Sequence, residues 1–280
     1  MAYVQVNAAN GKEVRRWCDG CGTLLLGGRC SICGSPGREF EINSPGDIRP
    51  CMGDSVGILE GLLEEAFGTA APIENKSVFF NKVPGEDRTD EVVAHGQVIA
   101  VLRFDIAADR LRIELRQPGA ELFAPVATKN VVTISGVSGH LKGKGIAGEN
   151  VSDVLGHFAD GDPIIVRKAL KVGPGVAMAD SDSMRSAEKA LRVRDLNAPS
   201  DMPLSPDADR DTFVRANRDH LKGLEGTAVR EIRGFVKNVR LPVTVSFSGG
   251  KDSLAAYGLT AKAVGDPAVS YTHLTLPTIA

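Results

Sequence analysis

Apolar residues recur at helical spacing in one segment of the chain and alternate with polar residues in several shorter ones. Residues 53–68 predict an amphipathic helix, capped by Asp54 or Ser55, whose core face would contain Val56, Leu59, Leu62, Leu63 and Phe67. Residues 76–83 predict a strand, and residues 97–117 predict two strands. We therefore expect residues 51–124 to form a small α+β unit, reached from the N-terminal segment through a breaker-rich linker at residues 42–50.

The pattern changes after residue 124. Between residues 125 and 195, short apolar runs alternate with glycine turns, which is typical of a small β-barrel. Residues 196–211 contain three prolines and several other turn formers, and they predict a linker. One or two helices should follow, interrupted at Gly223 and Gly226, with an apolar face of Phe213, Val214, Leu221, Leu224, Val229, Ile232 and Val236.

The last predicted elements are a strand, a glycine loop and a helix. "PVTVSFS" is nearly continuous in apolar and small residues, as a buried parallel strand is, and "SLAAYGLTAKAV" is helix-like. The loop between them, "GGKD", allows a tight turn that points backbone amides and a helix N-terminus at an anion. The alternative is an ordinary glycine turn before a core helix.

Composition narrows the function classes. The 280 residues are enough for two or more domains, and the net charge of -2 means that any RNA-binding face must be local. Aromatic residues make up only 5%, with Trp17 as the single tryptophan, so few platforms for base stacking are expected. We find no apolar run long enough for a membrane span and no apolar signal core, which predicts a cytoplasmic protein without a membrane partner.

Four of the five cysteines form two matched pairs. Cys18, Cys21, Cys30 and Cys33 have the spacing C-x2-C-x8-C-x2-C, and a glycine follows each pair. Four thiolates suit the tetrahedral coordination of Zn²⁺, so residues 1–50 predict a zinc ribbon with a closed, structural metal site. The alternative is a set of free or redox-active cysteines. The fifth cysteine, Cys51, is expected to be a small buried thiol.

The segment 125–195 resembles a PUA domain, an RNA-binding module of many RNA-modifying enzymes. The resemblance rests on "GKGIAGENVSDV", on "FADGDPIIVRK", and on "GPGVAMADSDSM" followed by "EKALRVRD". It implies RNA as a partner, tRNA or rRNA in the first instance. Lys142 and Lys144 flank glycines in "LKGKG" and are the candidate phosphate contacts, with a solvated lysine turn as the alternative.

The loop "SGGKDS" resembles the PP-loop of the adenine nucleotide alpha hydrolase-like superfamily and matches each fixed position of S-G-G-x-D-S. The resemblance implies that Ser248, Gly249, Gly250 and Ser253 bind the pyrophosphate end of ATP or an adenylyl sulfonucleotide. Lys251 would place a cation beside that charge. Asp252 would cap the helix and help to organise Mg²⁺. Residues 212–268 would then begin a Rossmann-like α/β domain.

Together, the ribbon, the PUA-like segment and the PP-loop resemble the PUA-containing members of the phosphoadenosine phosphosulfate reductase family. This resemblance implies a nucleotide-dependent transferase that adenylates RNA or transfers sulfur to it, with a sulfur donor protein as a further partner. One alternative is a sulfonucleotide reductase, although no nucleophilic cysteine follows Cys51. Another is a non-enzymatic RNA-binding protein with a vestigial loop.

The final residues differ in texture from the rest. Residues 269–278, "VSYTHLTLPT", read like a translated sequencing-library adapter. We therefore expect residues 269–280 to be a non-native tail that packs against little, and the genuine fragment to end near Ala268. One strand and one helix cannot bury both faces of a parallel sheet, so the fragment itself is expected to be inactive.

Overall fold

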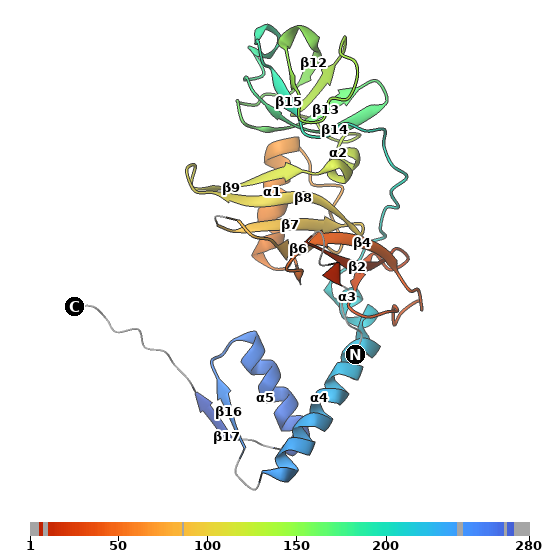
Figure 1. Ribbon diagram of the computed structural model, residues 1–280, viewed down its shortest axis with the longest axis vertical. Coiled ribbons are helices and arrows are strands. Elements are labelled where there is room, and N and C mark those ends of the chain that lie inside the picture. The colour runs from red at the N-terminus through yellow and green to blue at the C-terminus, as the bar shows by residue number, and fades with distance from the viewer. Residues whose placement is uncertain (1–5, 8–10, 86, 240–242, 266–267, 272–280) are drawn as a thin grey trace, which may run out of the picture. The chain divides into compact units, whose positions relative to one another are not determined.

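The computed structural model describes residues 6–7, 11–85, 87–239, 243–265 and 268–271. The chain divides into two compact units, Met1–Ala216 and Asn217–Ala280, and each is described by itself. Figure 1 shows the elements of both. No helix within the described ranges combines the length and the apolar character that a membrane crossing needs.

The first unit begins with a small antiparallel sheet. Its longest strand, β2, pairs with each of the other three, and the strands are β1 (Val6–Asn7), β2 (Lys12–Cys18), β3 (Thr23–Leu25) and β4 (Arg38–Asn43). Trp17 on β2 is fully buried, with its ring edge-on to Phe40 and Phe79 at centroid distances of 6.4 and 5.9 Å. This aromatic cluster joins the first sheet to the next one, because Phe79 belongs to the second sheet.

The predicted linker at residues 42–50 is mostly strand. Ile42 lies in β4 and is buried, and β5 (Asp47–Pro50) pairs with β6 of the second sheet. The second sheet is a five-stranded antiparallel meander of β5, β6 (Phe79–Lys82), β7 (Thr89–Ala94), β8 (Gln97–Asp105) and β9 (Arg110–Leu115). The strands predicted at 76–83 and 97–117 are confirmed, and β7 was not predicted.

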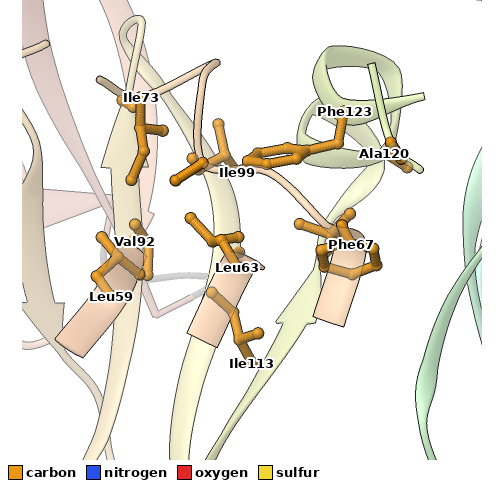
Figure 2. Close-up of a cluster of buried hydrophobic side chains, with 14 of the residues drawn as sticks. Leu59, Leu63, Phe67, Ile73, Val92, Ile99, Ile113, Ala120 and Phe123 are labelled. Atoms are coloured by element: carbon orange, nitrogen blue, oxygen red, sulfur yellow. The ribbon is translucent and has the colours of Figure 1, made fainter. Parts of the chain in front are cut away.

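Helix α1 (Asp54–Phe67) and helix α2 (Gln117–Phe123) pack on this sheet, and Figure 2 shows the resulting core. Leu59, Leu63 and Phe67 are buried as predicted, whereas Val56 is exposed. The predicted side-chain cap at Asp54 or Ser55 is wrong. The cap residue is Gly53, without a side-chain hydrogen bond, and the helix ends at Gly68 in the left-handed conformation.

Residues 131–193 form a curved six-stranded sheet in the order β11-β15-β14-β13-β10-β12. Its strands are antiparallel except for the pair β10–β13, and they are β10 (Val131–Ile134), β11 (Gly145–Ile146), β12 (Val151–Leu155), β13 (Pro163–Lys168), β14 (Lys171–Ala177) and β15 (Leu191–Val193). Its apolar side encloses a core of its own. A 3-10 turn at Gly148–Asn150 lies within "GKGIAGENVSDV". The expected barrel is thus present as a half-barrel sheet.

The segment after the half-barrel lies against the rest of the first unit. We call residues 196–216 the strap; it ends in helix α3 (Arg210–Ala216). Ser205 and Ala208 are buried, and Ala208 is held through both of its backbone polar groups: its N–H donates to the Asn75 carbonyl and its carbonyl accepts from the Ser77 hydroxyl. The predicted linker therefore connects two elements as expected, but it is docked and not free.

The second unit contains α4 (Arg218–Asn238), β16 (Thr244–Phe247), α5 (Lys251–Val264) and β17 (Ala268–Tyr271). The predicted interruption of α4 at Gly223 and Gly226 is wrong, because the helix runs through both. It is held beside α5, since the Arg233 guanidinium donates to two carbonyls in the last turn of α5.

β17 pairs with β16 in parallel, with Thr244 opposite Ala268 and Phe247 opposite Tyr271. The expectation that residues 269 onward pack against little is therefore wrong for the first of them. The strand–helix–strand order explains the pairing, because a crossover helix returns the chain beside its first strand. Residues 272–280 lie outside the described residues, and the interpretation of the tail as adapter stays a prediction.

His95 is a packing residue. It is buried; its Nδ1 accepts from the Ser205 N–H at 2.9 Å and its Nε2 lies 3.0 Å from the Pro72 carbonyl oxygen. A carbonyl only accepts, so Nε2 carries the proton and the ring is neutral. Burial lowers the pKa of His95, because the charged imidazolium is poorly solvated there.

This arrangement predicts a loss of stability in mild acid. The unfolded chain binds a proton at His95 near the ordinary pKa of about 6.5, whereas the folded chain resists it. Stability should therefore be full above that pH and fall as the pH drops through it toward the lower folded value. Urea unfolding followed by Trp17 fluorescence between pH 7.5 and 5 measures this. The pH dependence should shrink in His95→Gln and persist in His140→Gln, because His140 is exposed.

Candidate functional site

The four cysteines of the two Cys-x-x-Cys pairs lie together in the first unit. Their sulfur atoms are within 4.8 Å of one another, with Cys18 Sγ 3.4 Å from Cys33 Sγ and Cys30 Sγ 3.7 Å from Cys21 Sγ. Four sulfurs at about 2.3 Å from a tetrahedral Zn²⁺ are about 3.8 Å apart, so this cluster fits the ion. The predicted grouping is confirmed, and the four cysteines could bind zinc.

Each pair sits in a tight turn that ends in a glycine. The Cys21 N–H donates to the Cys18 carbonyl, and the Gly34 N–H donates to the Cys30 carbonyl. The glycine after each pair is in the left-handed region, Gly22 at φ +62° and Gly34 at φ +75°. The sequence thus shapes both turns so that their thiols face a common point.

The cluster favours a bound cation. Burial raises the pKa of the Cys21 thiol to about 11 and raises that of Cys18 as well, whereas a backbone hydrogen bond at Ser35 lowers the pKa of Cys33 to about 7. Thiolates are the metal ligands, and a dication would offset the cost of burying their charge. If all four sulfurs bound one Zn²⁺, they would complete its usual four-coordinate shell, and the ion would have no position for a substrate.

Cys51 lies apart from this cluster. It is half-buried directly after β5, and burial raises the pKa of its thiol to about 11. A thiol that stays protonated at neutral pH is a weak nucleophile. The prediction of a small buried thiol is confirmed in part, since Cys51 is half-buried against the core of the second sheet.

The glycine loop lies between β16 and α5, in the predicted strand–loop–helix order. Gly249 has φ +78°, a conformation that strains any residue with a side chain. Gly250 has φ −80° and ψ 165°, which any residue adopts, and an added Cβ would meet only Ser248 Oγ at 3.6 Å. The backbone therefore explains the first glycine but not the second. A small residue at position 250 leaves open space at the start of α5.

Two hydroxyl groups line this space. Ser248 Oγ donates to Ser253 Oγ at 3.3 Å, and Ser253 Oγ donates to the Gly250 carbonyl at 2.9 Å. The predicted cap by Asp252 is wrong, because Gly250 occupies the cap position and no side chain caps α5. Asp252 instead lies exposed in the first turn, beside an exposed Lys251. The structure thus brings all six predicted loop residues to one helix start.

The two predicted lysines of the half-barrel are exposed in the turn before β11. Lys142 forms an ion pair with Asp195 at 3.2 Å, which partly neutralises its charge, whereas Lys144 has no ion pair among the described residues. Sequence reasoning missed Arg192 and Arg194. Arg192 lies opposite Gly145 in the β11–β15 pair, and both arginines are exposed. The alternation in "LRVRD" was the signal that could have found them.

Comparison with known proteins gives distant relatives. No family model matches the chain. The uncharacterized protein MJ0066 of Methanocaldococcus jannaschii is 29% identical over 269 residues, which are 91% of this chain and 56% of the relative. The uncharacterized protein MJ0973 of the same organism is 24% identical over 195 residues, which are 68% of this chain and 43% of that protein. The chain spans about half the length of the curated relatives it matches.

Two solved structures of PUA proteins are similar to part of the chain. A PUA domain of Aeropyrum pernix, APE0525, has a TM-score of 0.40 at 16% identity and covers 61% of this chain and 91% of its own. A conserved PUA domain protein of Thermoplasma acidophilum has a TM-score of 0.39 at 15% identity and covers 57% and 100%. With TM-scores below 0.5, these similarities do not establish the function of this chain.

Proposed function

We propose that the chain belongs to a PP-loop enzyme that activates an acceptor with an adenine nucleotide and is directed to RNA by its half-barrel. The observation that carries the nucleotide part is the open start of α5, where Gly250 has no backbone reason to be glycine. A small residue there lets an anion approach the amide groups at the helix N-terminus. The match of "SGGKDS" to the PP-loop pattern supplies the identity of that anion.

In this proposal the loop binds the pyrophosphate end of ATP. The amides of Gly249 and Gly250 and the hydroxyls of Ser248 and Ser253 hold phosphate oxygens, and Lys251 adds a positive charge. The acceptor attacks the α-phosphorus, a bond forms between them, and the bond to the departing pyrophosphate breaks. Catalysis then consists of positioning and charge stabilisation.

Asp252 would be repelled by phosphate in the first turn of α5 unless a cation lies between them. Its carboxylate and the phosphate oxygens are the ligands that Mg²⁺ prefers, and the ion would neutralise the charge of the leaving group. This is the role we assign to Asp252 in place of the helix cap.

We propose that Lys144, Arg192 and Arg194, with Lys142, form the RNA-facing surface. Arg192 lies on β15, Arg194 directly follows that strand and is already paired with Glu114 at 3.6 Å, and the lysines lie in the neighbouring turn. Exposed cations of this kind suit a phosphate backbone, and such contacts position RNA without reading its sequence. The net charge of -2 makes this local patch necessary for any affinity.

The joint test is pyrophosphate release from ATP with Mg²⁺, with and without total tRNA or rRNA, in a protein that extends to the length of the relatives. We expect release that RNA stimulates. Release without any effect of RNA would favour a free sulfonucleotide or other small acceptor. RNA binding without release would favour the non-enzymatic alternative.

Charge removal on the half-barrel should weaken RNA binding with graded effects. Arg192→Ala and Lys144→Ala should each lower affinity and reduce the dependence of log K on log salt by about one unit, as for one lost phosphate contact. Lys142→Ala should do less, because Asp195 already pairs with that lysine. Filter binding over a salt series measures these slopes. Lys12→Ala on β2 is the matched control, and an equal loss in that variant would contradict the assigned surface.

A further inference from the structure

The end of the strap closes over the cysteine cluster. Ala216 is fully buried and packs with Cys18, Cys30 and Leu25. Its carbonyl accepts a hydrogen bond of 2.8 Å from the N–H of Ser31, which lies inside the second Cys-x-x-Cys turn. The direction of that N–H depends on the turn around Cys30. The contact therefore exists only while the turn keeps the shape that its two thiols require.

A glycine of the first turn also allows the strap to approach closely. Gly22 follows Cys21 at φ +62°, and a Cβ at this position would lie 2.7 Å from the Pro206 carbonyl oxygen. The same residue thus permits the turn at the first pair of thiols and the close approach of the strap. Both Cys-x-x-Cys turns touch the strap through backbone atoms.

The middle of the strap is fixed on the residue before the first cysteine. Trp17 Nε1–H donates to Ser205 Oγ at 3.0 Å, and the ring of Phe213 lies 5.1 Å from that of Phe79 in the cluster that buries Trp17. Trp17 and Cys18 are neighbours on β2. The strap therefore contacts the ribbon at Trp17, Gly22 and Ser31, all within two residues of a cysteine of the cluster.

We propose that the ribbon is a metal-dependent latch for the strap. A metal held by the four cysteines fixes both turns, the turns hold the strap, and Ala216 stays in place as the last residue of the first unit. The point at which the chain leaves this unit then depends on metal occupancy. Because such coupling is reciprocal, strap docking should strengthen metal binding by the same factor that metal strengthens docking. This inference does not depend on the proposed nucleotide activity.

The first test removes the metal from the protein loaded with Zn²⁺. Hydrogen exchange is compared before and after chelation in the strap, in the ribbon and in the hairpin β13–β14, which reports the half-barrel. We expect protection of residues 205–216 to fall at least about tenfold while the hairpin keeps its protection. Emission of Trp17, the single tryptophan, should shift as its indole loses Ser205 and meets water. Unchanged strap protection in a ribbon that has lost its own would overturn the proposal.

The second test measures coupling from the other side. Phe213→Ala removes a strap side chain that packs against Phe79 in the aromatic cluster around Trp17. It should weaken Zn²⁺ binding at least about fivefold, the low end of typical coupling. Val214→Ala is the matched control. Val214 is the next residue along the chain and is exposed, so its truncation should leave the Zn²⁺ affinity unchanged. If Phe213→Ala loses the protection of β13–β14, Ser205→Ala replaces it, because it deletes only a hydroxyl. A Zn²⁺ affinity within twofold of the parent protein, in whichever of these two variants stays folded, would contradict the proposed latch.

Discussion

Cys30→Ser should remove the bound metal and unfold the ribbon. Cys30 is a buried member of the cluster, and serine supplies a hard, protonated oxygen in place of a soft thiolate. Structural zinc contributes about 10–16 kcal/mol of apparent binding free energy in small zinc modules, which is comparable with the whole stability of a domain. Metal analysis should fall from about one zinc per chain to nearly none, and Trp17 should become solvent-exposed.

Cys51→Ser is the control for this change. Cys51 belongs to the same residue type but lies outside the cluster, so zinc content should be unaffected. A Cys30→Ser protein that keeps a full complement of zinc and a protected β2 would contradict the metal site. Loss of zinc in both variants would indicate that the assay responds to general destabilisation.

The parts of the fold that the sequence predicted well are those in which one residue pattern has one physical solution. The spacing of Leu59, Leu63 and Phe67 has a helical period, and the alternation in residues 110–115 has a strand period, so each places its apolar face against the core. The paired cysteines were equally decisive, because the turn after each pair needs a glycine and both have one.

Strand β7 escaped prediction because its polar residues are buried. Asp90 is fully buried between the guanidinium groups of Arg49 and Arg88, and Glu91 accepts hydrogen bonds from Asn43 and Asn81. Arg49 and Asn43 lie more than 40 residues from the carboxylates that they contact, and a nearby arginine such as Arg88 gives no sign of a buried pair. A pattern of hydrophobic and polar positions assigns such carboxylates to the surface, and only tertiary pairing makes their burial affordable.

The strap escaped for a similar reason. Its prolines and acidic residues have the composition of a solvated linker, but its backbone polar groups find partners on the ribbon and the second sheet. Ser205 alone is bound by Trp17 and His95, which lie 188 and 110 residues away. The composition of a segment shows that it can be solvated, but it does not show whether another part of the fold offers its backbone groups hydrogen-bond partners.

Gly250→Val should abolish pyrophosphate release while leaving the fold intact. Its φ and ψ suit valine, and no backbone atom lies within 4 Å of an added Cβ, so α5 should form as before. The methyl groups would instead fill the space in which, in the proposed complex, the amides at the start of α5 would face the phosphates. Loss of one positioned donor typically costs a hundredfold or more in rate, and the valine would displace the whole anion.

The measurement is pyrophosphate release with ATP, Mg²⁺ and RNA in the protein of the relatives' length, with circular dichroism to confirm helix content. Gly258→Ala is the matched control, because Gly258 lies in the same helix with open space around it. Asp252→Ala should also lose activity, and excess Mg²⁺ should restore part of it if the carboxylate only organises the ion. Full activity in Gly250→Val would mean that the glycine pair serves the turn alone. Strain at Gly249 would then remain as the sole physical reason for the motif, and the nucleotide would have to bind elsewhere.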